Sequence, residues 1–276
     1  MISAIDDELI KKLVKIQDLL SKKAILIDDK RLKEDYEDDL PLPKLVGSLS
    51  LSVSLEDPNN GYMALIIYDT ELCQVVKKVI KNIDLGCYKD LKLTRKYLQQ
   101  HYPDEEPDLF PLNLPEDSKS FPYITNFLAF REAEPYAEAI IELEEEFKPK
   151  LLITEGGGRL HPRKCGLATH LGLLVNIPTI GVAKDLLEVG KWNRNIIKEH
   201  FDKFLSKNSF DIDYIDEIVG KALKSNNSSR IIYVSPGHLI SIDTAINLIC
   251  ELSEYRIPEP LREASFAAKN ARRESS

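Results

Sequence analysis

Residues 151–187 read LLITEGGGRLHPRKCGLATHLGLLVNIPTIGVAKDLL, and this stretch decides the fold class. The apolar run 151–154 predicts a buried strand, 166–176 predicts a helix, and 178–183 predicts a second buried strand. Strands that alternate with helices indicate an α/β sheet with parallel members. The alternation continues in both directions, through expected helices at 135–147 and 241–252 and an expected strand at 230–235.

The segment before this stretch predicts an antiparallel start to the sheet. Residues 45–55 alternate apolar side chains with serines, which predicts a strand with one buried face. The turn PNNG (58–61) leads into GYMALIIYD, so these two strands should form a hairpin, and 73–80 is expected as the third strand of the meander. The result is a mixed sheet flanked by helices, compatible with an RNase H-like α/β architecture. The pattern alone leaves flavodoxin-like orders open.

The remaining segments set the expected domain boundaries. Residues 5–24 carry apolar side chains at three- and four-residue spacing, which predicts an amphipathic helix. Residues 86–120 include an expected short helix around 91–100, followed by a run rich in proline and acidic side chains, which predicts an exposed insertion with poor order. We therefore expect an N-terminal helix and acidic linker at 1–44, a domain at 45–265 with the insertion 86–120 inside it, and a basic tail at 266–276.

The composition is that of a globular protein, with 276 residues, 43% hydrophobic and 30% charged. No run of about 18 apolar residues appears, so no contact with a membrane is expected. The polar, acidic start MISAIDDELIKK lacks the features of a secretory signal, so we expect the cytoplasm or the nucleus. The chain is expected to be a monomer. The four cysteines show no C-x-x-C spacing, so neither a disulfide framework nor a zinc site is expected.

Charge is distributed unevenly along the chain. The net charge is −8, which argues against attraction of the whole protein to nucleic acid. Residues 1–150 hold 20 Lys and Arg against 30 Asp and Glu, a net of −10, whereas residues 151–276 hold 17 against 15, a net of +2. A surface that binds phosphates should therefore draw on the second half.

Polar residues gather where the core strands end. Glu155 and the glycines 156–158 follow the first core strand, and Lys184 follows the second. His238 follows the strand at 230–235. Because ligands of open α/β sheets bind beyond the carboxyl ends of parallel strands, these side chains are expected to converge. A carboxylate with histidines suits a divalent metal and a lysine suits a phosphate oxygen, although structural salt bridges explain such residues about as often.

Several ordered motifs together resemble the endonuclease V family. The run 153–187 is similar to its glycine-loop, His-Pro-Arg and Gly-Leu-Ala-x-His-Leu-Gly motifs, followed by its Ile-Gly-Val-Ala-Lys strand. FPYITNFLAFRE (121–132) looks like its wedge and its Phe-Arg-Glu motif, and 233–241 and 256–265 resemble its C-terminal motifs. The similarity is strong over 121–187 and 230–265, weaker over 8–80 and absent over 86–119.

This resemblance implies an RNase H-like fold, Mg²⁺ or Mn²⁺ as cofactor, and inosine in single-stranded or structured DNA or RNA as the ligand. Family members cut the second phosphodiester bond 3′ to the inosine. By the resemblance, the wedge is Pro122, Tyr123, Ile124 and Thr125, and the pocket for the base is framed by Gly156, Gly157 and Gly158, with Arg163 nearby. The catalytic set is Glu132 and Glu155 as metal ligands, Lys184 as a phosphate contact, and His161 and His238.

The chain departs from the family at three carboxylate positions. Ser50 stands where the family has its first catalytic aspartate, Glu155 replaces the second aspartate, and Ser265 replaces a third. A neutral serine removes a bridging ligand, and the extra methylene of Glu155 moves its carboxylate by roughly an ångström. Much reduced activity is therefore expected. The resemblance leaves three hypotheses: a weakened endonuclease, a catalytically inactive protein that still binds inosine-containing nucleic acid, and a scaffold in which these residues serve packing.

Overall fold

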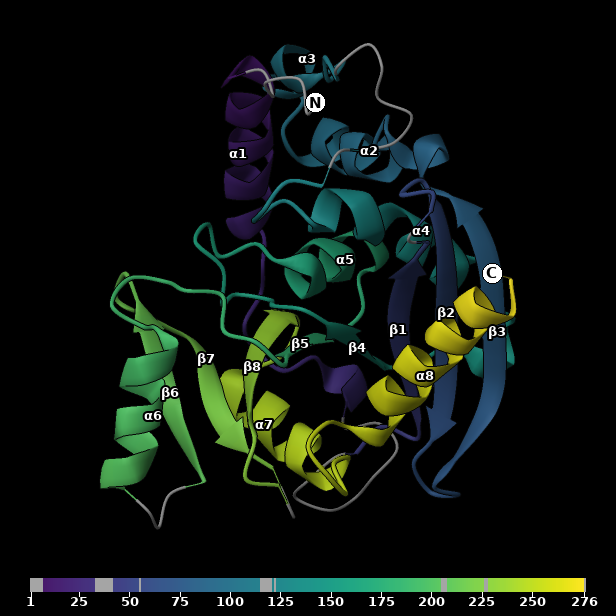
Figure 1. Ribbon diagram of the computed structural model, residues 1–276. Coiled ribbons are helices and arrows are strands. Elements are labelled where there is room, and N and C mark those ends of the chain that lie inside the picture. Colours follow the sequence, from purple (N-terminus) through teal and green to yellow (C-terminus); the bar gives the residue numbers. More distant parts are fainter. Residues whose placement is uncertain are drawn as a thin grey trace.

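The computed structural model describes most of the chain and consists of one mixed sheet with helices on both faces (Figure 1). The described residues are 7–32, 42–54, 56–114, 121, 123–204, 208–225 and 228–275. The expected acidic linker falls largely outside them. Within these residues, no helix combines the length and the hydrophobicity that crossing a bilayer requires.

Eight strands form the sheet in the order β3-β2-β1-β4-β5-β8-β7-β6. Their bounds are β1 Leu45–Val53, β2 Asn60–Asp69, β3 Gln74–Asp84, β4 Leu151–Glu155, β5 Thr179–Ala183, β6 Ser209–Tyr214, β7 Glu217–Lys224 and β8 Ile231–His238. Strands β1, β4 and β5 are parallel, and all other neighbours are antiparallel. The mixed sheet and the antiparallel three-stranded start are therefore confirmed.

Helices cover both faces of this sheet. Their bounds are α1 Asp7–Ser21, α2 Lys92–His101, α3 Glu106–Leu109, α4 Ala129–Ile141, α5 Leu167–Val175, α6 Arg194–Lys203, α7 Ile242–Glu251 and α8 Glu259–Glu274. Helices α4 and α5 pack on one face, where Leu49 and Leu152 point. Helix α7 and the start of α8 pack on the other, against Val46 and Ile153. Helix α8 runs diagonally across β1 and β2 (Figure 1).

Strand β1 has two buried faces, so the expectation of one was wrong. Its serine face is buried as completely as its leucine face, with Ser48 fully covered and Ser50 4% exposed. Ser48 Oγ donates a hydrogen bond to the Ile153 carbonyl of β4 at 2.9 Å, which satisfies the buried hydroxyl. Short side chains on this face leave room for α8 to approach the sheet closely. The serines of β1 thus mark small side chains on a buried face and do not mark a solvent-exposed face.

Helix α2 confirms the short helix expected around 91–100, and the rest of the insertion that the structure describes is ordered as well, contrary to expectation. Helices α2 and α3 bury Leu98, Leu109 and Phe110 in a cluster with α1. Hydrogen bonds also attach α2 to α4: Glu134 of α4 accepts from the Leu93 and Thr94 amides at the start of α2, at 2.9 and 2.8 Å. The insertion therefore completes the core around α1, and its residues 115–120 lie outside the described part.

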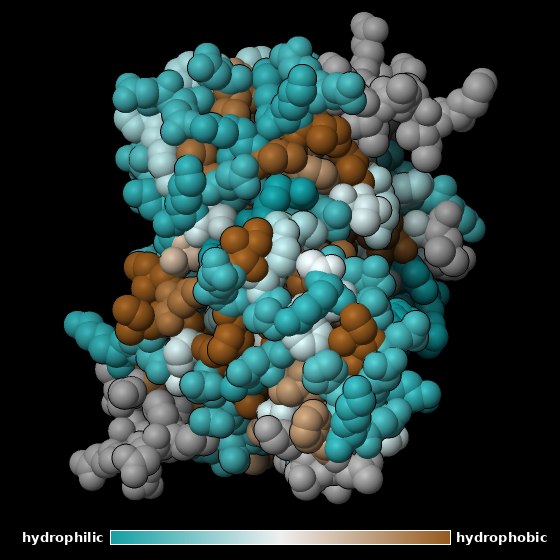
Figure 2. Space-filling view, turned by 90° about the vertical axis from the view of Figure 1, so that its left-hand side faces the viewer, coloured by the Kyte–Doolittle hydropathy of each residue, from teal (hydrophilic) through white to brown (hydrophobic). Residues whose placement is uncertain are grey.

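The boundaries of two helices and one group of elements also differ from expectation. Helix α4 begins at Ala129, six residues before the expected 135, because packing of its first turns outweighs the proline within it. Residues 266–274 are not a separate tail, since α8 continues to Glu274 and buries Ala267 and Ala268 against β2. Helix α6 and the β6–β7 hairpin were not foreseen, and their core residues include Trp192 and Phe201. On the side of the molecule where these elements lie, hydrophobic side chains appear in separate groups between hydrophilic ones (Figure 2).

Candidate nucleic-acid site

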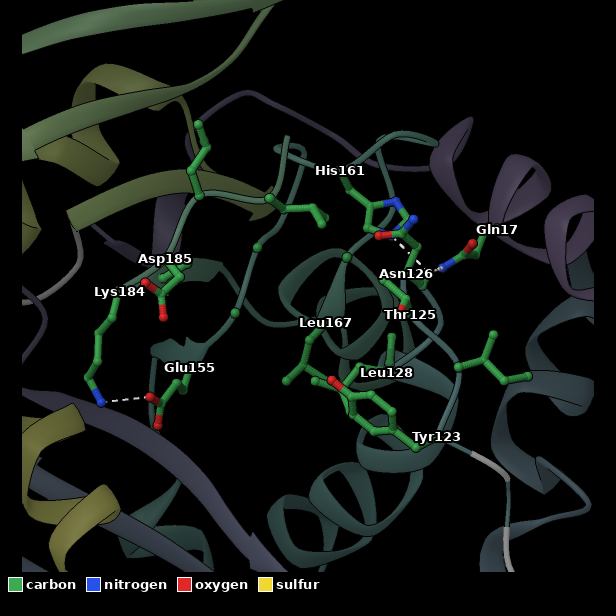
Figure 3. Close-up of a pocket in the computed structure, with 18 residues that line it drawn as sticks. Gln17, Tyr123, Thr125, Asn126, Leu128, Glu155, His161, Leu167, Lys184 and Asp185 are labelled. Atoms are coloured by element: carbon green, nitrogen blue, oxygen red, sulfur yellow. Dashed lines mark hydrogen bonds and ion pairs between the residues drawn. The ribbon is translucent and has the colours of Figure 1, made fainter. Parts of the chain in front are cut away.

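A cavity of about 610 Å³ opens at the carboxyl ends of β4 and β5 (Figure 3). One wall is the segment 123–129, the opposite wall is the segment 183–187, and the loop after β4 lies between them. Tyr123 therefore faces Lys184 and Asp185 across the cavity (Figure 3). This is the sheet edge at which the sequence predicted a site.

Glu155 and Lys184 form an ion pair at the floor of the cavity. Glu155 is the last residue of β4 and pairs with Val182 of β5, so Lys184 follows two residues later on the same side of the sheet. The Lys184 Nζ lies 2.6 Å from Glu155 Oε1, a charge-assisted hydrogen bond. The sequence correctly predicted that these two side chains come together.

The two serines lie on the elements that border Glu155. Leu49 of β1 pairs with Thr154 of β4, so Ser50 is the next position beside Glu155. Ser265 is buried on α8, next to Ala264, which packs on the sheet at Ala64. Position 50 of β1 and position 265 of α8 therefore carry no carboxylate.

Glu132 enters from the opposite layer, in the first turn of α4. The Tyr136 hydroxyl donates to its Oε2 at 3.4 Å. Burial, followed by repulsion from the Glu155 carboxylate, raises the pKa of Glu132 from 4.5 to about 8. Glu132 is therefore largely protonated at neutral pH, and it lies close enough to Glu155 for their charges to interact.

The wedge segment projects from a rigid anchor. Tyr123 is 70% exposed, and Ile124 and Thr125 follow it at the rim of the cavity, while Pro122 lies outside the described residues. The anchor is the Asn126 carbonyl, which accepts hydrogen bonds from three side chains, those of Gln17 at 3.1 Å, His161 at 2.9 Å and Arg163 at 3.0 Å.

His161 and Arg163 thus hold the wedge in place. His161 Nδ1 accepts from the Arg163 amide at 3.2 Å, so Nε2 carries the proton that is donated to the Asn126 carbonyl. Burial, with the Arg163 charge, lowers the pKa of His161 to about 4, which keeps the imidazole neutral. The Arg163 guanidinium also lies 4.3 Å from the centre of the Phe127 ring. Both side chains of the His-Pro-Arg motif are therefore engaged on the protein side.

The loop after β4 requires its glycines. Gly156 has φ +138°, a conformation that other residues rarely adopt. A Cβ at Gly158 would lie 2.2 Å from the Pro236 carbonyl oxygen of β8. The loop can therefore pass close to β8 and present its backbone to the cavity only without side chains.

Comparison with known proteins gives the family. The endonuclease V family model matches residues 111–266, more than half of the chain. Endonuclease V of Dictyoglomus turgidum is 39% identical over 228 residues, which cover 82% of this chain and 87% of that protein. Endonuclease V of a Nostoc species is 36% identical over 208 residues, or 74% of this chain and 88% of the relative.

This chain belongs to the endonuclease V family. Solved structures agree with this membership over nearly the whole chain. Human endonuclease V, as its catalytic domain, superposes with a TM-score of 0.79 at 26% identity, covering 98% of both chains. Ciona intestinalis endonuclease V, solved in complex with a 23mer DNA containing an inosine followed by a ribo-adenosine, gives a TM-score of 0.79 at 25% identity, covering 99% of this chain and 100% of that one. The RNase H-like fold expected from the sequence is confirmed.

His238 does not reach the cavity, so its predicted convergence with Glu155 and Lys184 was wrong. Strand β8 is antiparallel to β5, and His238 pairs with Thr179 at the beginning of β5. It therefore lies at the opposite end of the strand from Lys184. There its Nδ1 accepts a hydrogen bond from the Ile25 amide at 3.2 Å. The prediction treated all core strands as parallel, and the direction of β8 cannot be read from its composition.

The donor set does not fit the divalent metal site that the family resemblance implies. A two-metal site needs several carboxylates to bridge and neutralise the ions. Of the four side chains at the corresponding positions, two are the serines Ser50 and Ser265, and Glu155 is paired with Lys184. Among the residues that the structure describes, no group of three or more His, Cys, Asp or Glu side chains could hold a metal ion.

Three cavity residues were missed from the sequence. Gln17 reaches the wedge from α1, 109 residues away, and no local pattern signals such a contact. Asn126 has φ +69°, and an asparagine is one of the few residues that adopts this conformation readily, so it was detectable as a turn residue. Asp185 extends the acidic side of the cavity and pairs with Arg194 at 2.6 Å.

Proposed function

We propose that this member of the endonuclease V family binds inosine-containing nucleic acid at the cavity, and that its hydrolysis of the phosphodiester bond is strongly reduced or lost. The observation that carries the proposal is the pairing of an exposed aromatic wedge, Tyr123, with a cavity of about 610 Å³ directly behind it. A base extruded from a strand needs both features, since the cavity must receive the base and an aromatic face must replace its stacking on the neighbours.

The ligand class follows from the family. Ciona intestinalis endonuclease V has been solved with DNA containing an inosine followed by a ribo-adenosine. In the proposed complex Tyr123 stacks beside the extruded base, and the lining of the cavity by Tyr123, Gly156 and Gly157 supports this arrangement. The three hydrogen bonds to the Asn126 carbonyl hold the backbone that follows the wedge segment before binding, which lowers the ordering cost of the complex.

Hydrolysis is the part that the local chemistry does not favour. Mg²⁺ or Mn²⁺ in this family would supply the charge that stabilises the transition state and activates water. Ser50 and Ser265 offer no negative charge to hold such ions, and the Glu155 carboxylate is already neutralised by Lys184. The metal is therefore expected to bind weakly or not at all.

A weakened endonuclease is the second candidate. It is favoured by one observation, the contribution of the Glu155 charge to the raised pKa of Glu132, which makes the two carboxyl groups neighbours. Two carboxylates with water ligands are a common way to hold a single Mg²⁺. The two candidates share the same ligand and differ only in the cleavage step.

The test compares binding and cleavage on matched strands. Fluorescence anisotropy measures the affinity for a single strand containing inosine and for the same strand with adenine, in the parent and in Tyr123→Ala. We expect loss of the stacked ring to weaken binding of the inosine strand by about 1–3 kcal/mol and to affect the adenine strand much less. Tyr255→Ala removes an exposed ring between α7 and α8 and is the matched control, with no expected effect.

Two results would count against the proposal. Equal weakening on both strands would mean that Tyr123 does not read the lesion. Absence of any preference of the parent for inosine would remove the proposed ligand altogether. Single-turnover incubation of the same inosine strand with Mg²⁺ and then Mn²⁺ separates the two candidates, since slow cleavage that depends on Glu132 and Glu155 supports the weakened endonuclease.

A further inference from the structure

The contact between Lys184 and Glu155 has a feature that a simple surface ion pair lacks. It lies at the edge of the sheet where Ser50 of β1 meets the end of β4, in the region where the family resemblance implies divalent ions. Both side chains are partly shielded from solvent, with 29% of Lys184 and 38% of Glu155 exposed. The ammonium group is thus a positive charge directly on the one carboxylate that remains beside Ser50.

We propose that Lys184 acts as the resident cation of this site, so that the chain binds its nucleic-acid ligand without a divalent ion and has no divalent-ion site at this edge. The charges of the neighbouring groups support this assignment. With serine at 50 and 265, these two positions contribute no charge, and at the Lys184–Glu155 pair one ammonium balances one carboxylate. A Mg²⁺ or Mn²⁺ ion would have to displace Lys184 from Glu155, with no second charged ligand from β1 to compensate it.

No other charged side chain that lines the described part of the cavity offers a free carboxylate for a divalent ion. Besides Glu155 and Lys184, the charged side chain that lines the described part of the cavity is Asp185, which is exposed and paired with Arg194 at 2.6 Å. His161 is neutral and hydrogen-bonded to Asn126. A lysine fixed by a carboxylate presents its remaining N–H groups in a defined direction, which suits a phosphate or a base carbonyl and requires no metal.

Mn²⁺ binding, followed by electron paramagnetic resonance in the absence of nucleic acid, tests the proposal. We expect the parent to leave the signal of free Mn²⁺ unchanged at millimolar concentration. Ser50→Asp supplies a second carboxylate, and adding Lys184→Met to it removes the competing charge. The double variant should bind one Mn²⁺ per chain at least about tenfold more tightly than Ser50→Asp alone, because a positive charge within a few ångströms opposes the ion.

The matched control is Ser50→Asp with Lys191→Met, which removes a lysine paired at 3.1 Å with Asp213, on the surface. It should bind Mn²⁺ like Ser50→Asp alone. Lys184→Gln replaces Lys184→Met if the latter does not fold. The proposal is overturned if the parent binds one Mn²⁺ that Glu155→Gln removes, or if loss of Lys184 leaves the Mn²⁺ affinity of a folded Ser50→Asp chain unchanged.

A second measurement addresses the ligand itself. The affinity of the parent for an inosine strand should be the same in EDTA and in Mn²⁺, and a clear dependence on Mn²⁺ would overturn the proposal. The Mn²⁺ titration contains no nucleic acid, so its outcome is independent of the proposed function. Failure to bind inosine strands would leave the titration result standing, and a tight Mn²⁺ site would leave inosine binding standing.

Discussion

Restoring the carboxylates should restore cleavage if their loss is what disables the site. The perturbation is the combination of Ser50→Asp, Glu155→Asp and Ser265→Asp. Ser50 already lies beside Glu155, since Leu49 pairs with Thr154 in the parallel register of β1 and β4. Serine and aspartate are close in size, so the substitution should be tolerated. The strand register then places the new carboxylate beside Glu155, where a bridging ligand would be needed.

The magnitude follows from geometry and charge. Glu155→Asp draws the carboxylate back by roughly an ångström, and a displacement of that size can change a rate by about 10²-fold. Ser50→Asp adds a full negative charge within reach of the same ion. Because the three groups would serve one metal cluster, their effects are strongly non-additive. We expect the triple variant to cleave at least about 10²-fold faster than any single variant.

The assay is single-turnover cleavage of an inosine strand in Mg²⁺ and in Mn²⁺ by the parent, the three single variants and the triple variant. Ser275→Asp, at the end of α8, adds the same charge away from the site and should change nothing. A triple variant that is folded but no faster than the parent would refute the reasoning, because position and charge would then be insufficient. A parent that already cleaves as fast as the triple variant would refute it equally, since Glu132 and Glu155 would then suffice.

Four further outcomes are expected. Burial lowers the pKa of His161 to about 4 and that of His170 to about 3, so on acidification the unfolded chain binds these protons before the folded chain does. The free energy of unfolding should therefore fall as pH drops from 6.5 to 4, by about 1.4 kcal/mol per pH unit for each histidine. A flat profile in chemical denaturation would contradict this. Burial, and then the Glu155 charge, raise the pKa of Glu132 to about 8. The stability that the protonated Glu132 contributes should therefore be lost as pH rises from 4.5 through 8. Glu132→Gln should flatten that loss in the same denaturation measurement. Gln17→Ala removes one of the three donors to the Asn126 carbonyl, so hydrogen exchange across the wedge should increase, with a cost of about 0.5–1.5 kcal/mol. Unchanged exchange would show that the other two donors suffice. Leu98→Ala should lower the free energy of unfolding in urea by about 2–5 kcal/mol, because α2 completes the core around α1. A change near zero would mean that the insertion packs no more tightly than a surface loop.

The sequence predicted the parts of the fold that depend on local periodicity. The hairpin of β1 and β2, the helix Leu167–Val175 and the buried strands β4 and β5 follow directly from spacing of apolar residues. The direction of β8 could not be predicted in this way, because a short apolar run has the same composition in either direction. The misplacement of His238 follows from that single error.

The site was predictable where it depends on strand ends and unpredictable where it depends on distant contacts. Glu155 and Lys184 lie at neighbouring carboxyl ends of parallel strands, so their ion pair was foreseeable. The roles of His161 and Arg163 as supports of the wedge required knowledge of the Asn126 carbonyl between them. Composition made the insertion appear disordered, although its leucines and phenylalanine are spaced to cover α1.

The proposed recognition residues and the altered carboxylate positions lie on different parts of this fold. The wedge is fixed by α1 and the loop around His161, whereas the altered carboxylate positions belong to β1, β4 and α8. A carboxylate at position 50 would be buried beside Glu155, and without a metal ion two such charges repel each other in a poorly solvated place. A serine there removes that cost and leaves the packing of α8 on the sheet intact. Loss of the metal would therefore favour serine at this position on grounds of stability alone, and would leave the wedge and the cavity unaffected.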